Sequence, residues 1–508
     1  MTTVLASPLV EPTRPALTSS RGFAPVAVLL GLLGFLVSVT GSWVPSYWGD
    51  EAASVMSAER SLPSLFRMLG NIDAVHGSYY LFLHGWIDVF GASELATRLP
   101  SALAIGLATA GTAVLARMLV NTRVAVIAGL VFAVLPRVTY MGAEARSTAL
   151  ATMLAVWTVI LLVHIVRNRP SAPVLRLVLW TAYALMVTLS AYMFLYTALL
   201  IPVHALAVAL FSRRRRGALL AWAGAAAAGL LLASPVFYWG VGEREQISFL
   251  ARRPAVSVFD AAVHQWFGTP TLAGLAWALI AIGVVATFVP RFHTRGRAPR
   301  AELLVVLAWA LVPSAVLLAG TQLITPMYSL RYLSICAPAA ALAVAVGVAA
   351  LRPRWTQVVS VLLVGALATP GYLAQRTDFA KDGGSDWRQV SDILRTEARP
   401  GDAVVFDEST KPSQRPRLAM HLYPAGFVGL SDVMLNRSYQ DVDWLWDTTI
   451  PLAEATSRLA GTNRVWVLHN VGSRETVAGT DIGVLQQLGF TVHSSLTVNR
   501  TILTELTR

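Results

Sequence analysis

The stretch FAPVAVLLGLLGFLVSVTGSWV, residues 23–44, is followed almost at once by Tyr47-Trp48-Gly49-Asp50-Glu51-Ala52. At about 1.5 Å of rise per residue, this uncharged stretch is long enough to cross a bilayer as a helix. The two adjacent carboxylates therefore lie where the chain leaves the membrane. A second polar cluster, with Asp73 and His76, follows in the same loop.

Carboxylates at a membrane interface suit a general base that acts on a lipid-linked substrate. An alcohol is a poor nucleophile at neutral pH, and a carboxylate within hydrogen-bond reach can take its proton as the new bond forms. The same residues would also be ordinary in a solvated loop. Spacing by itself therefore leaves both interpretations of Asp50 and Glu51 open.

The composition is that of a polytopic membrane protein: 508 residues, 13% of them charged, with a mean hydropathy of +0.58. The net charge of +12 does not indicate a nucleic-acid partner, because the arginines form short clusters between apolar runs. A single cysteine, Cys336, excludes an intramolecular disulfide and disfavours a thiolate metal cluster. No small-residue cleavage site follows the first apolar run, which we interpret as a retained helix.

Apolar segments predict a mainly α-helical polytopic membrane protein with about eleven transmembrane helices. With a cytoplasmic N-terminus, every second loop carries arginines, as the positive-inside rule requires. This topology predicts a plasma-membrane protein whose C-terminal part is extracytoplasmic. The predicted spans are residues 23–44, 95–118, 123–136, 147–166, 173–189, 191–212, 217–239, 271–290, 301–320, 331–350 and 355–374.

The chain divides into three parts by composition: a cytoplasmic tail (1–22), a transmembrane part (23–376) with a long outer loop (45–94), and an extracytoplasmic α/β domain (377–508). Within the loop, 62–69 and 79–90 are expected to be interfacial helices. The α/β domain is expected to support the fold or to recognise an acceptor. Its expected helices are 386–397, 451–459 and 481–488, and its expected strands are 402–407, 464–468 and a pair within 490–506.

Arginines of the outer loops need an explanation other than topology. Four of them, Arg137, Arg146, Arg244 and Arg331, are predicted near the outer surface, where a guanidinium can bind a phosphate in a bidentate manner. Fixed cations would stabilise the charge that develops on a departing phosphate. For Arg331, at the start of a span, snorkelling or an ion pair is the alternative.

The loop residues Asp73 and His76 are candidates for an acceptor-binding or base-orienting pair, with a polar turn before an amphipathic helix as the alternative. A metal site made from Asp50, Asp73 and His76 is not favoured, because neither DxD nor HxH spacing is present. We therefore expect no cofactor and no metal.

Taken together, these motifs resemble the polytopic C-type glycosyltransferases, the GT-C superfamily. A first span ends in an aromatic-rich Asp50-Glu51-Ala52, and a loop with Asp73, His76 and Tyr79-Tyr80 follows. The most similar group is that of the bacterial relatives of protein O-mannosyltransferases and of the lipid A aminoarabinose transferase. Further matching segments are Ala143-Glu144-Ala145-Arg146, Ala191-Tyr192-Met193-Phe194-Leu195-Tyr196 and Leu330-Arg331-Tyr332.

The resemblance implies an enzyme that takes a sugar from a polyprenyl-phosphate donor on the outer side, with inversion at the anomeric carbon. Carried over, Asp50 would be the general base, with Glu51 beside it. The acceptor-binding or base-orienting residues would be Asp73, His76 and Tyr79. The donor-phosphate contacts would be Arg331, Arg146 and Arg244. Relatives usually have His-Pro-Pro where this chain has His76-Gly77-Ser78, so the backbone there is expected to be less stiff.

A mannosyltransferase that acts on an extracytoplasmic glycan, glycolipid or protein is the leading hypothesis. An arabinofuranosyltransferase of the same architecture is its close alternative. From another class, the rival is a flippase or transporter for a lipid-linked sugar. Transporters tend to carry ionisable residues near mid-membrane and internal repeats, whereas the charges here gather in outer loops and no repeat is evident. Catalysis is therefore favoured.

Overall fold

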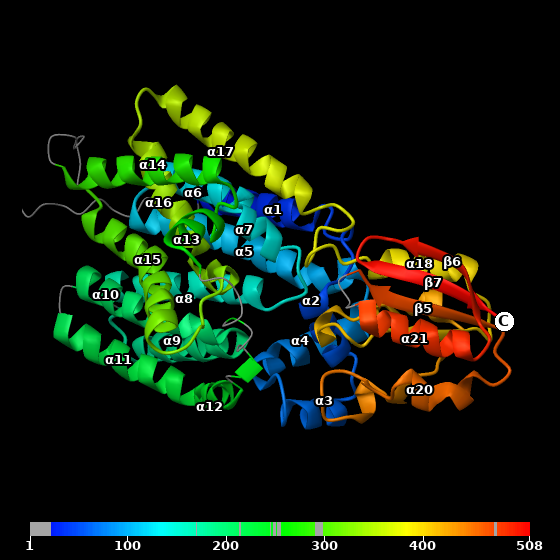
Figure 1. Ribbon diagram of the computed structural model, residues 1–508. Helices are drawn as coiled ribbons and strands as arrows, with labels where there is room; N and C mark the ends of the chain where they lie inside the picture. The colour runs from blue at the N-terminus through cyan, green and yellow to red at the C-terminus, as the bar shows by residue number, and fades with distance from the viewer. Residues whose placement is uncertain are drawn as a thin grey trace, which may run out of the picture.

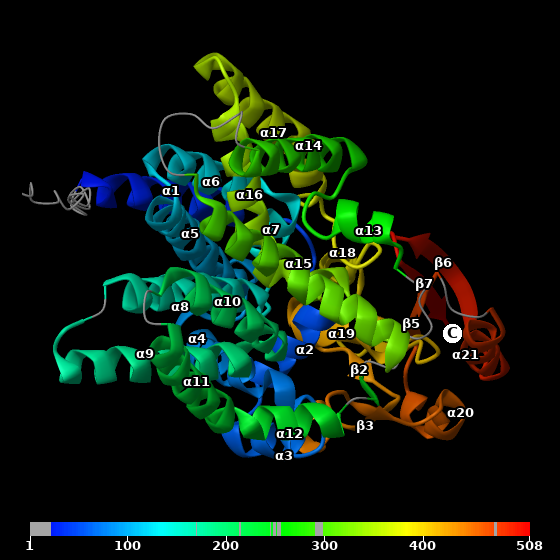
Figure 2. The same ribbon diagram turned by 90° about the vertical axis from the view of Figure 1, so that its left-hand side faces the viewer.

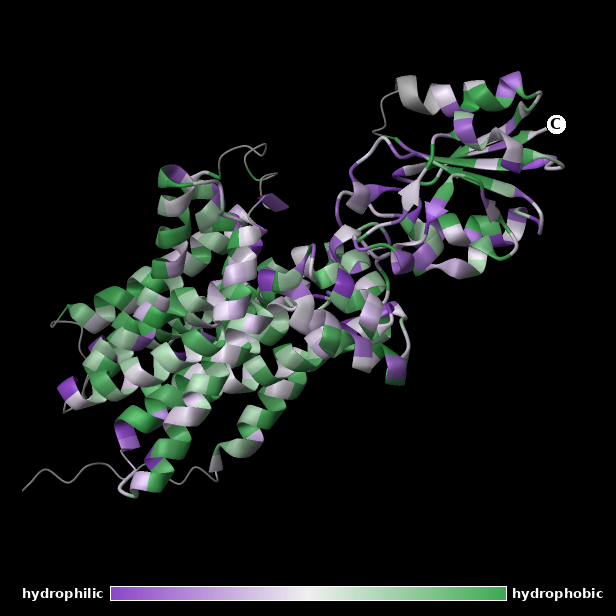
Figure 3. Cartoon of the chain, turned by 90° about the horizontal axis from the view of Figure 1, so that it is seen from below, coloured by the Kyte–Doolittle hydropathy of each residue, from purple (hydrophilic) through white to green (hydrophobic). Residues whose placement is uncertain are grey.

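The computed structural model describes residues 22–168, 170–212, 215–243, 245–246, 250, 256–289, 298–471 and 475–508. A helical bundle forms one end of the molecule and a β-sheet the other, with helix α2 (Gly49–Ala58) between them (Figures 1 and 2). The bundle is largely apolar in colour, and the sheet end is mixed (Figure 3). This division follows the change in composition along the chain.

The apolar segments predicted from the sequence are all helical. Within the described part of the chain, seven helical segments have the length and hydropathy of membrane spans, and α11 with α12 makes a further span if the pair, bent by 52°, is counted as one. Three further apolar segments are shorter, so the count of eleven spans stays a prediction. The seven are α5 (Glu94–Leu119), α8 (Thr148–Asn168), α9 (Pro173–Met193), α14 (Pro270–Phe288), α15 (Arg300–Leu323), Leu330–Ala350 (η6 and α16) and α17 (Arg354–Ala374). The others are α11 (Arg215–Leu232) with α12 (Ser234–Gly242), and the shorter α1 (Ala24–Val39), α6 (Thr122–Val134) and Leu195–Phe211 (η3 and α10).

Glycines allow the first helix to pack tightly in the bundle. A Cβ on Gly31 of α1 would lie 3.0 Å from the carbonyl oxygen of Gly106 in α5, and a Cβ on Gly106 would lie 3.0 Å from that of Gly31. Close backbone approach through small residues is a common way for helices to associate in membranes. Helix α1 ends at Val39, before the predicted end of the span, and Gly41 turns the chain with a φ of 70°.

The outer loop between α1 and α5 is built from short helices. Helix α2 is followed by α3 (Leu62–Leu69), the 3-10 turn η2 (Ala74–His76) and α4 (Gly77–Phe90). Both helices expected in this loop are present. Pro63 stands near the start of α3, where its missing N–H costs nothing, and Gly91, with a φ of 77°, ends α4.

The C-terminal part contains a five-stranded mixed sheet in the order β2-β1-β5-β7-β6. Strands β2, β1 and β5 are parallel, with Val404 opposite both Asp432 and Trp466, while β7 runs antiparallel to β5 and β6. The sheet strands are β1 (Ala403–Phe406), β2 (Ser431–Asp432), β5 (Arg464–Asn470), β6 (Thr491–Thr497) and β7 (Thr501–Thr507). A separate two-stranded ladder pairs β3 (Leu435–Arg437) with β4 (Thr448–Thr449).

The predicted C-terminal elements are present with small shifts in their ends. The expected strand pair is β6 and β7, and the helix expected at 481–488 begins earlier. The helices here are α18 (Trp387–Glu397), α19 (Leu418–Leu422), α20 (Leu452–Ala455) and α21 (Glu475–Gln487). The domain boundary at residue 377 stays a prediction.

Two arginines join the C-terminal part to the outer loop. Arg388 of α18 donates to the backbone carbonyls of Trp43 and Val44 and forms an ion pair with Glu94. Arg60, fully buried after α2, donates to the carbonyl oxygens of Val442 and Trp444, and also to that of Leu445. These contacts fix segments of the C-terminal part against α2, where the candidate site lies.

Candidate active site

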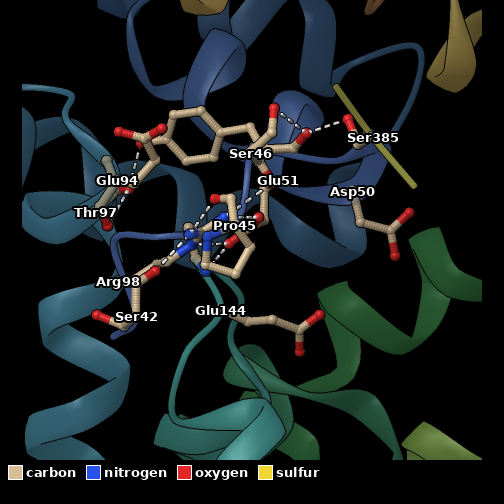
Figure 4. Close-up of polar contacts among 12 residues, drawn as sticks. Ser42, Pro45, Ser46, Asp50, Glu51, Glu94, Thr97, Arg98, Glu144 and Ser385 are labelled. Carbon is tan, nitrogen blue, oxygen red and sulfur yellow. Dashed lines mark hydrogen bonds and ion pairs between the residues drawn. The ribbon is translucent and has the colours of Figure 1, made fainter. Parts of the chain in front are cut away.

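Helix α2 carries the acidic pair in its first turn. A Cβ on Gly49 would lie 2.3 Å from the carbonyl oxygen of Ser413, so the C-terminal chain passes too close for any larger residue. Successive residues on an α-helix point about 100° apart, so Asp50 and Glu51 face different surroundings. Their side chains leave the helix in different directions in Figure 4.

Glu51 points into the protein and forms a buried ion pair with Arg98 of α5. Its Oε1 accepts from Arg98 Nε at 2.7 Å, and its Oε2 accepts from Nη2 at 2.6 Å. The N–H of Ala145 also donates to Oε1 at 2.8 Å, and Arg98 Nη1 donates to the carbonyls of Ser42 and Pro45. Both side chains are 0% exposed. The structure therefore places Glu51 among backbone anchors and away from the cavity.

Asp50 points the other way and lines a cavity of ≈ 310 Å³. Its Oδ2 forms an ion pair with Arg331 Nη1, and Arg146 Nη2 lies 3.9 Å away. Burial works to raise the pKa of Asp50, but Arg146 and Arg331 outweigh it and hold this pKa below its usual value. The sequence-predicted base thus meets two of the predicted phosphate-binding arginines.

Asp73 and His76 lie on the same cavity wall. Asp73 adopts a left-handed conformation with a φ of 62°, and its Oδ2 accepts from the hydroxyl of Tyr80 at 2.8 Å. His76 Nε2 lies 3.5 Å from Arg146 Nη2. Burial, together with the charge of Arg146, lowers the pKa of His76 to about 4, so the imidazole is neutral at neutral pH. The structure brings both predicted loop residues to Asp50.

Tyr79 and Arg244 differ from these residues. The Tyr79 side chain is buried, its hydroxyl has no hydrogen-bond partner among the described residues, and it does not line the cavity. Arg244 lies outside the described residues. Next to it, Glu243 is described, and its Oε1 accepts from the N–H of Ala74 at 2.8 Å.

The cavity walls come from distant parts of the chain. The C-terminal part supplies Ser413, Leu445 and Trp446. A second cavity of ≈ 760 Å³ shares three residues with the first, namely Arg137, Glu144 and Arg331. These three residues therefore border both cavities.

Arg137, which the sequence placed among the outer phosphate-binding arginines, lines the cavity. Sequence reasoning gave no functional role to four residues in and around this site: Arg98, Glu144, Glu243 and Lys381. Arg98 lies inside a predicted span, and a charge at such a position needs a partner. Glu144 lies in a short, charge-rich outer segment, and Lys381 is one of only two lysines in the chain. Those signals point to the residues but not to their partners.

The described residues contain no group of three or more His, Cys, Asp or Glu side chains placed to hold a metal ion. The expectation that no metal takes part stays a prediction.

Comparison with known proteins places this geometry in context. The family model described as dolichyl-phosphate-mannose-protein mannosyltransferase matches residues 78–239. ArnT from Cupriavidus metallidurans bound to undecaprenyl phosphate is 14% identical, with a TM-score of 0.58, and the match covers 96% of this chain and 98% of that chain. The chain shares the fold of ArnT. The apo state of ArnT matches with 13% identity, the same coverage and a TM-score of 0.56.

A more distant match is the oligosaccharyltransferase of Archaeoglobus fulgidus in complex with Zn and sulfate, at 12% identity and a TM-score of 0.46, covering 94% of this chain and 72% of that one. Comparison with curated proteins gives no match. The family-model match over residues 78–239 and the fold shared with ArnT support the resemblance to the GT-C superfamily that the motifs predicted.

Proposed function

We propose that this chain is a membrane glycosyltransferase that moves a sugar from a polyprenyl-phosphate donor to a hydroxyl acceptor outside the cytoplasm. The observation that carries the proposal is the placement of Asp50, Arg146 and Arg331 together on the wall of one cavity. A carboxylate and two guanidiniums are the groups that this reaction needs. Mannose is the proposed sugar, since the matching family model describes a mannosyltransferase.

The arginines are proposed to bind the donor phosphate. Arg137, Arg146 and Arg331 all line the cavity, and a guanidinium matches the geometry of a phosphate. When the bond between the sugar and the phosphate breaks, negative charge gathers on the phosphate, and fixed cations stabilise it. ArnT, which shares the fold, was solved with undecaprenyl phosphate bound. A polyprenyl phosphate is therefore the proposed carrier.

The acceptor hydroxyl is proposed to attack the anomeric carbon from the face opposite the phosphate, which inverts the configuration. Asp50 is the general base that the sequence resemblance assigns, and its carboxylate lines the cavity. Asp73 and His76 share that wall and are proposed to orient the acceptor. Glu51, held by Arg98, is proposed to position helix α2.

The second cavity suits a lipid-linked substrate. Apolar side chains of Leu250, Val256, Leu318 and Leu330 form part of its wall, and Arg331 connects it to the first cavity. We propose that the polyprenyl chain of the donor enters from this side. The acceptor, a glycan, glycolipid or protein, would then reach Asp50 through the first cavity. The plasma membrane, with the sheet end outside, is the proposed location.

The proposal is tested by transfer with purified protein in detergent. Labelled polyprenyl-phosphomannose is the donor and a cell-envelope extract supplies the acceptor. We expect label in a product for the native chain and none for Asp50→Asn, with the exposed pair member Asp443→Asn as the matched control. Transfer only from the arabinose analogue would replace the sugar and keep the mechanism. Movement of the lipid between leaflets without transfer would contradict the proposal.

A further inference from the structure

The proposed reaction releases a proton from the acceptor hydroxyl, and four carboxylates line the first cavity: Asp50, Asp73, Glu144 and Glu243. Three of them have partners. Asp50 is paired with two arginines, Asp73 accepts from a tyrosine hydroxyl, and Glu243 accepts from a backbone N–H. Of these four, only the Glu144 carboxylate accepts no hydrogen bond from a described residue and forms no ion pair with one. Its oxygens are therefore open to a substrate.

The backbone around Glu144 is held firmly, although its carboxylate is open. Its own carbonyl oxygen accepts from Ser101 Oγ at 2.5 Å, and the next N–H, of Ala145, donates to the buried Glu51. The residue is only 6% exposed. In Figure 4 the carboxylate points away from the Glu51–Arg98 pair, to the same side as Asp50. Such anchoring fixes the position of a side chain that borders both cavities.

Lys381 supplies a buried positive charge near Glu144. Its side chain is 1% exposed, and its Nζ has no hydrogen-bond partner among the described residues. The ammonium lies 3.8 Å from the ring centroid of Tyr140, four residues before Glu144. The charges of Lys381 and Glu144 attract each other, and this attraction favours the ionised form of the carboxylate.

The carboxylates of Glu144 and Asp50 differ in their affinity for a proton. Burial raises the pKa of Glu144, against the opposing effect of Lys381, whereas the pKa of Asp50 is lowered by its arginines. A general base works best when its pKa is near the operating pH. The titratable and charged groups whose charges act on Glu144 are Glu51, Tyr79, Arg137, Tyr140, Arg146, Arg331 and Lys381.

We propose that Glu144 is a second catalytic carboxylate, which takes the proton of the acceptor hydroxyl, with Lys381 as the cation that keeps it ionised. The inference rests on the proposed function. The acceptor oxygen forms a bond to the anomeric carbon, and the bond from that carbon to the phosphate oxygen breaks. Its electron pair stays on the phosphate, and the hydroxyl proton passes to the Glu144 carboxylate. This step refines the proposed function: Glu144 takes the place of Asp50 as the general base. Asp50 instead orients the hydroxyl and holds Arg331 and Arg146 in place.

The first test is the rate of transfer from polyprenyl-phosphomannose to the envelope extract by Glu144→Gln. We expect a loss of about 10²- to 10⁴-fold, with binding of polyprenyl phosphate retained, because a positioned base contributes about that much. Glu144→Asp keeps a carboxylate and is expected to recover part of the rate. Glu397→Gln, at an exposed position, is the matched control. A native rate in Glu144→Gln would overturn the inference.

The second test is the pH dependence of transfer by Lys381→Met. Removing the ammonium raises the pKa of Glu144, so the acidic limb of the rate profile is expected to move to higher pH, while Lys381→Arg leaves it near its native position. A structural defect would lower the rate at every pH without moving the limb, and that result would contradict the role given to Lys381.

A third measurement does not depend on activity. Infrared spectra recorded over a pH titration are expected to show a protonated carboxyl band that Glu144→Gln lacks and that Lys381→Met shifts to higher pH. Absence of any such difference would overturn the inference. Failure of the native chain to transfer sugar from any polyprenyl donor would instead overturn the proposed function.

Discussion

Asp50 and Glu51 are neighbours on helix α2, and each forms an ion pair with arginine. The two ion pairs lie in regions of the molecule with different roles. The closed pair, Glu51 with Arg98, is 0% exposed on both sides and is surrounded by backbone partners. The open cluster, Asp50 with Arg146 and Arg331, borders a cavity, and the side chains of Asp50 and Arg331 are 26% and 35% exposed. Both regions join a carboxylate to a guanidinium.

The difference shows that burial and unused hydrogen-bonding capacity, more than residue type, separate a structural ion pair from a chemical one. In the closed pair, the hydrogen-bond donors and acceptors are occupied by other groups of the protein, so none is left to bind a substrate. In the open cluster, a phosphate can compete with Asp50 for the same guanidiniums. Substitutions in one region or the other are therefore expected to have different effects.

Breaking the closed pair is expected to have the largest effect. Arg98→Met leaves the Glu51 carboxylate buried without its cation, which typically costs about 3–5 kcal/mol of stability. Thermal unfolding in detergent measures the loss, and transfer is expected to disappear with the folded protein. Arg395→Met, at a side chain that is 61% exposed, is the control. A native unfolding temperature for Arg98→Met would show that the closed pair is not structural.

Breaking the open cluster at Arg331 is expected to spare the fold and to damage the chemistry. Arg331→Gln removes one cation from the departing phosphate, and losing one such stabilising group typically costs about 10²- to 10³-fold in rate. Single-turnover transfer and thermal unfolding, measured on the same preparation, separate the two effects. Arg67→Gln, whose side chain is 52% exposed, serves as the comparison. Lost stability with an unchanged rate would reverse the assignment.

A smaller effect is expected from a substitution in the cavity wall that the C-terminal part supplies. Trp446 lines the cavity, and the buried Arg60 holds the segment that carries it. Trp446→Ala is expected to raise the KM for the acceptor about 10-fold, because apolar contact in a pocket is worth a few kcal/mol at most. Trp444→Ala, at a side chain that is 59% exposed, is the matched control. A change in donor KM instead would place the donor on this wall.

The smallest effect concerns stability against pH at His76. Its folded pKa of about 4 lies below the ordinary value of 6.5, so the unfolded chain binds a proton first as the pH falls. The stability that neutral His76 contributes to the folded state is therefore fully present above pH 6.5, and it declines as the pH falls from 6.5 to about 4. His76→Gln removes this contribution, and we expect its unfolding temperature to fall less between pH 7 and pH 5 than that of the native chain. An equal fall, with exposed His493→Gln as the reference, would contradict a neutral His76.

The sequence predicts the helical bundle well because apolar length is a local property. Residues 23–44 and 331–350 are read as spans without knowledge of any partner. Asp50 and Arg331 were expected in one site because their motifs resemble a family, although 281 positions separate them. The division of labour between Asp50 and Glu51 could not be predicted, since both are acidic and adjacent.

The roles that the sequence did not predict depend on contacts between residues far apart in the chain. Glu51 is structural because Arg98, inside a predicted span, reaches it from another helix. Glu144 lies in the motif Ala143-Glu144-Ala145-Arg146. Its carboxylate is open because no described residue donates a hydrogen bond to it. Trp446 lines the cavity, and Arg60 from the outer loop binds the carbonyl of Trp444 in the same segment. These outcomes depend on tertiary packing, which no local pattern encodes.

The most direct test of the account compares Asp50→Asn with Glu51→Gln in two assays: thermal unfolding, and transfer of labelled mannose from polyprenyl phosphate to an envelope extract. We predict that Asp50→Asn unfolds near the native temperature and loses transfer, whereas Glu51→Gln unfolds at a clearly lower temperature. Native transfer by a well-folded Asp50→Asn protein would contradict the account, because the open cluster would then have no part in the chemistry.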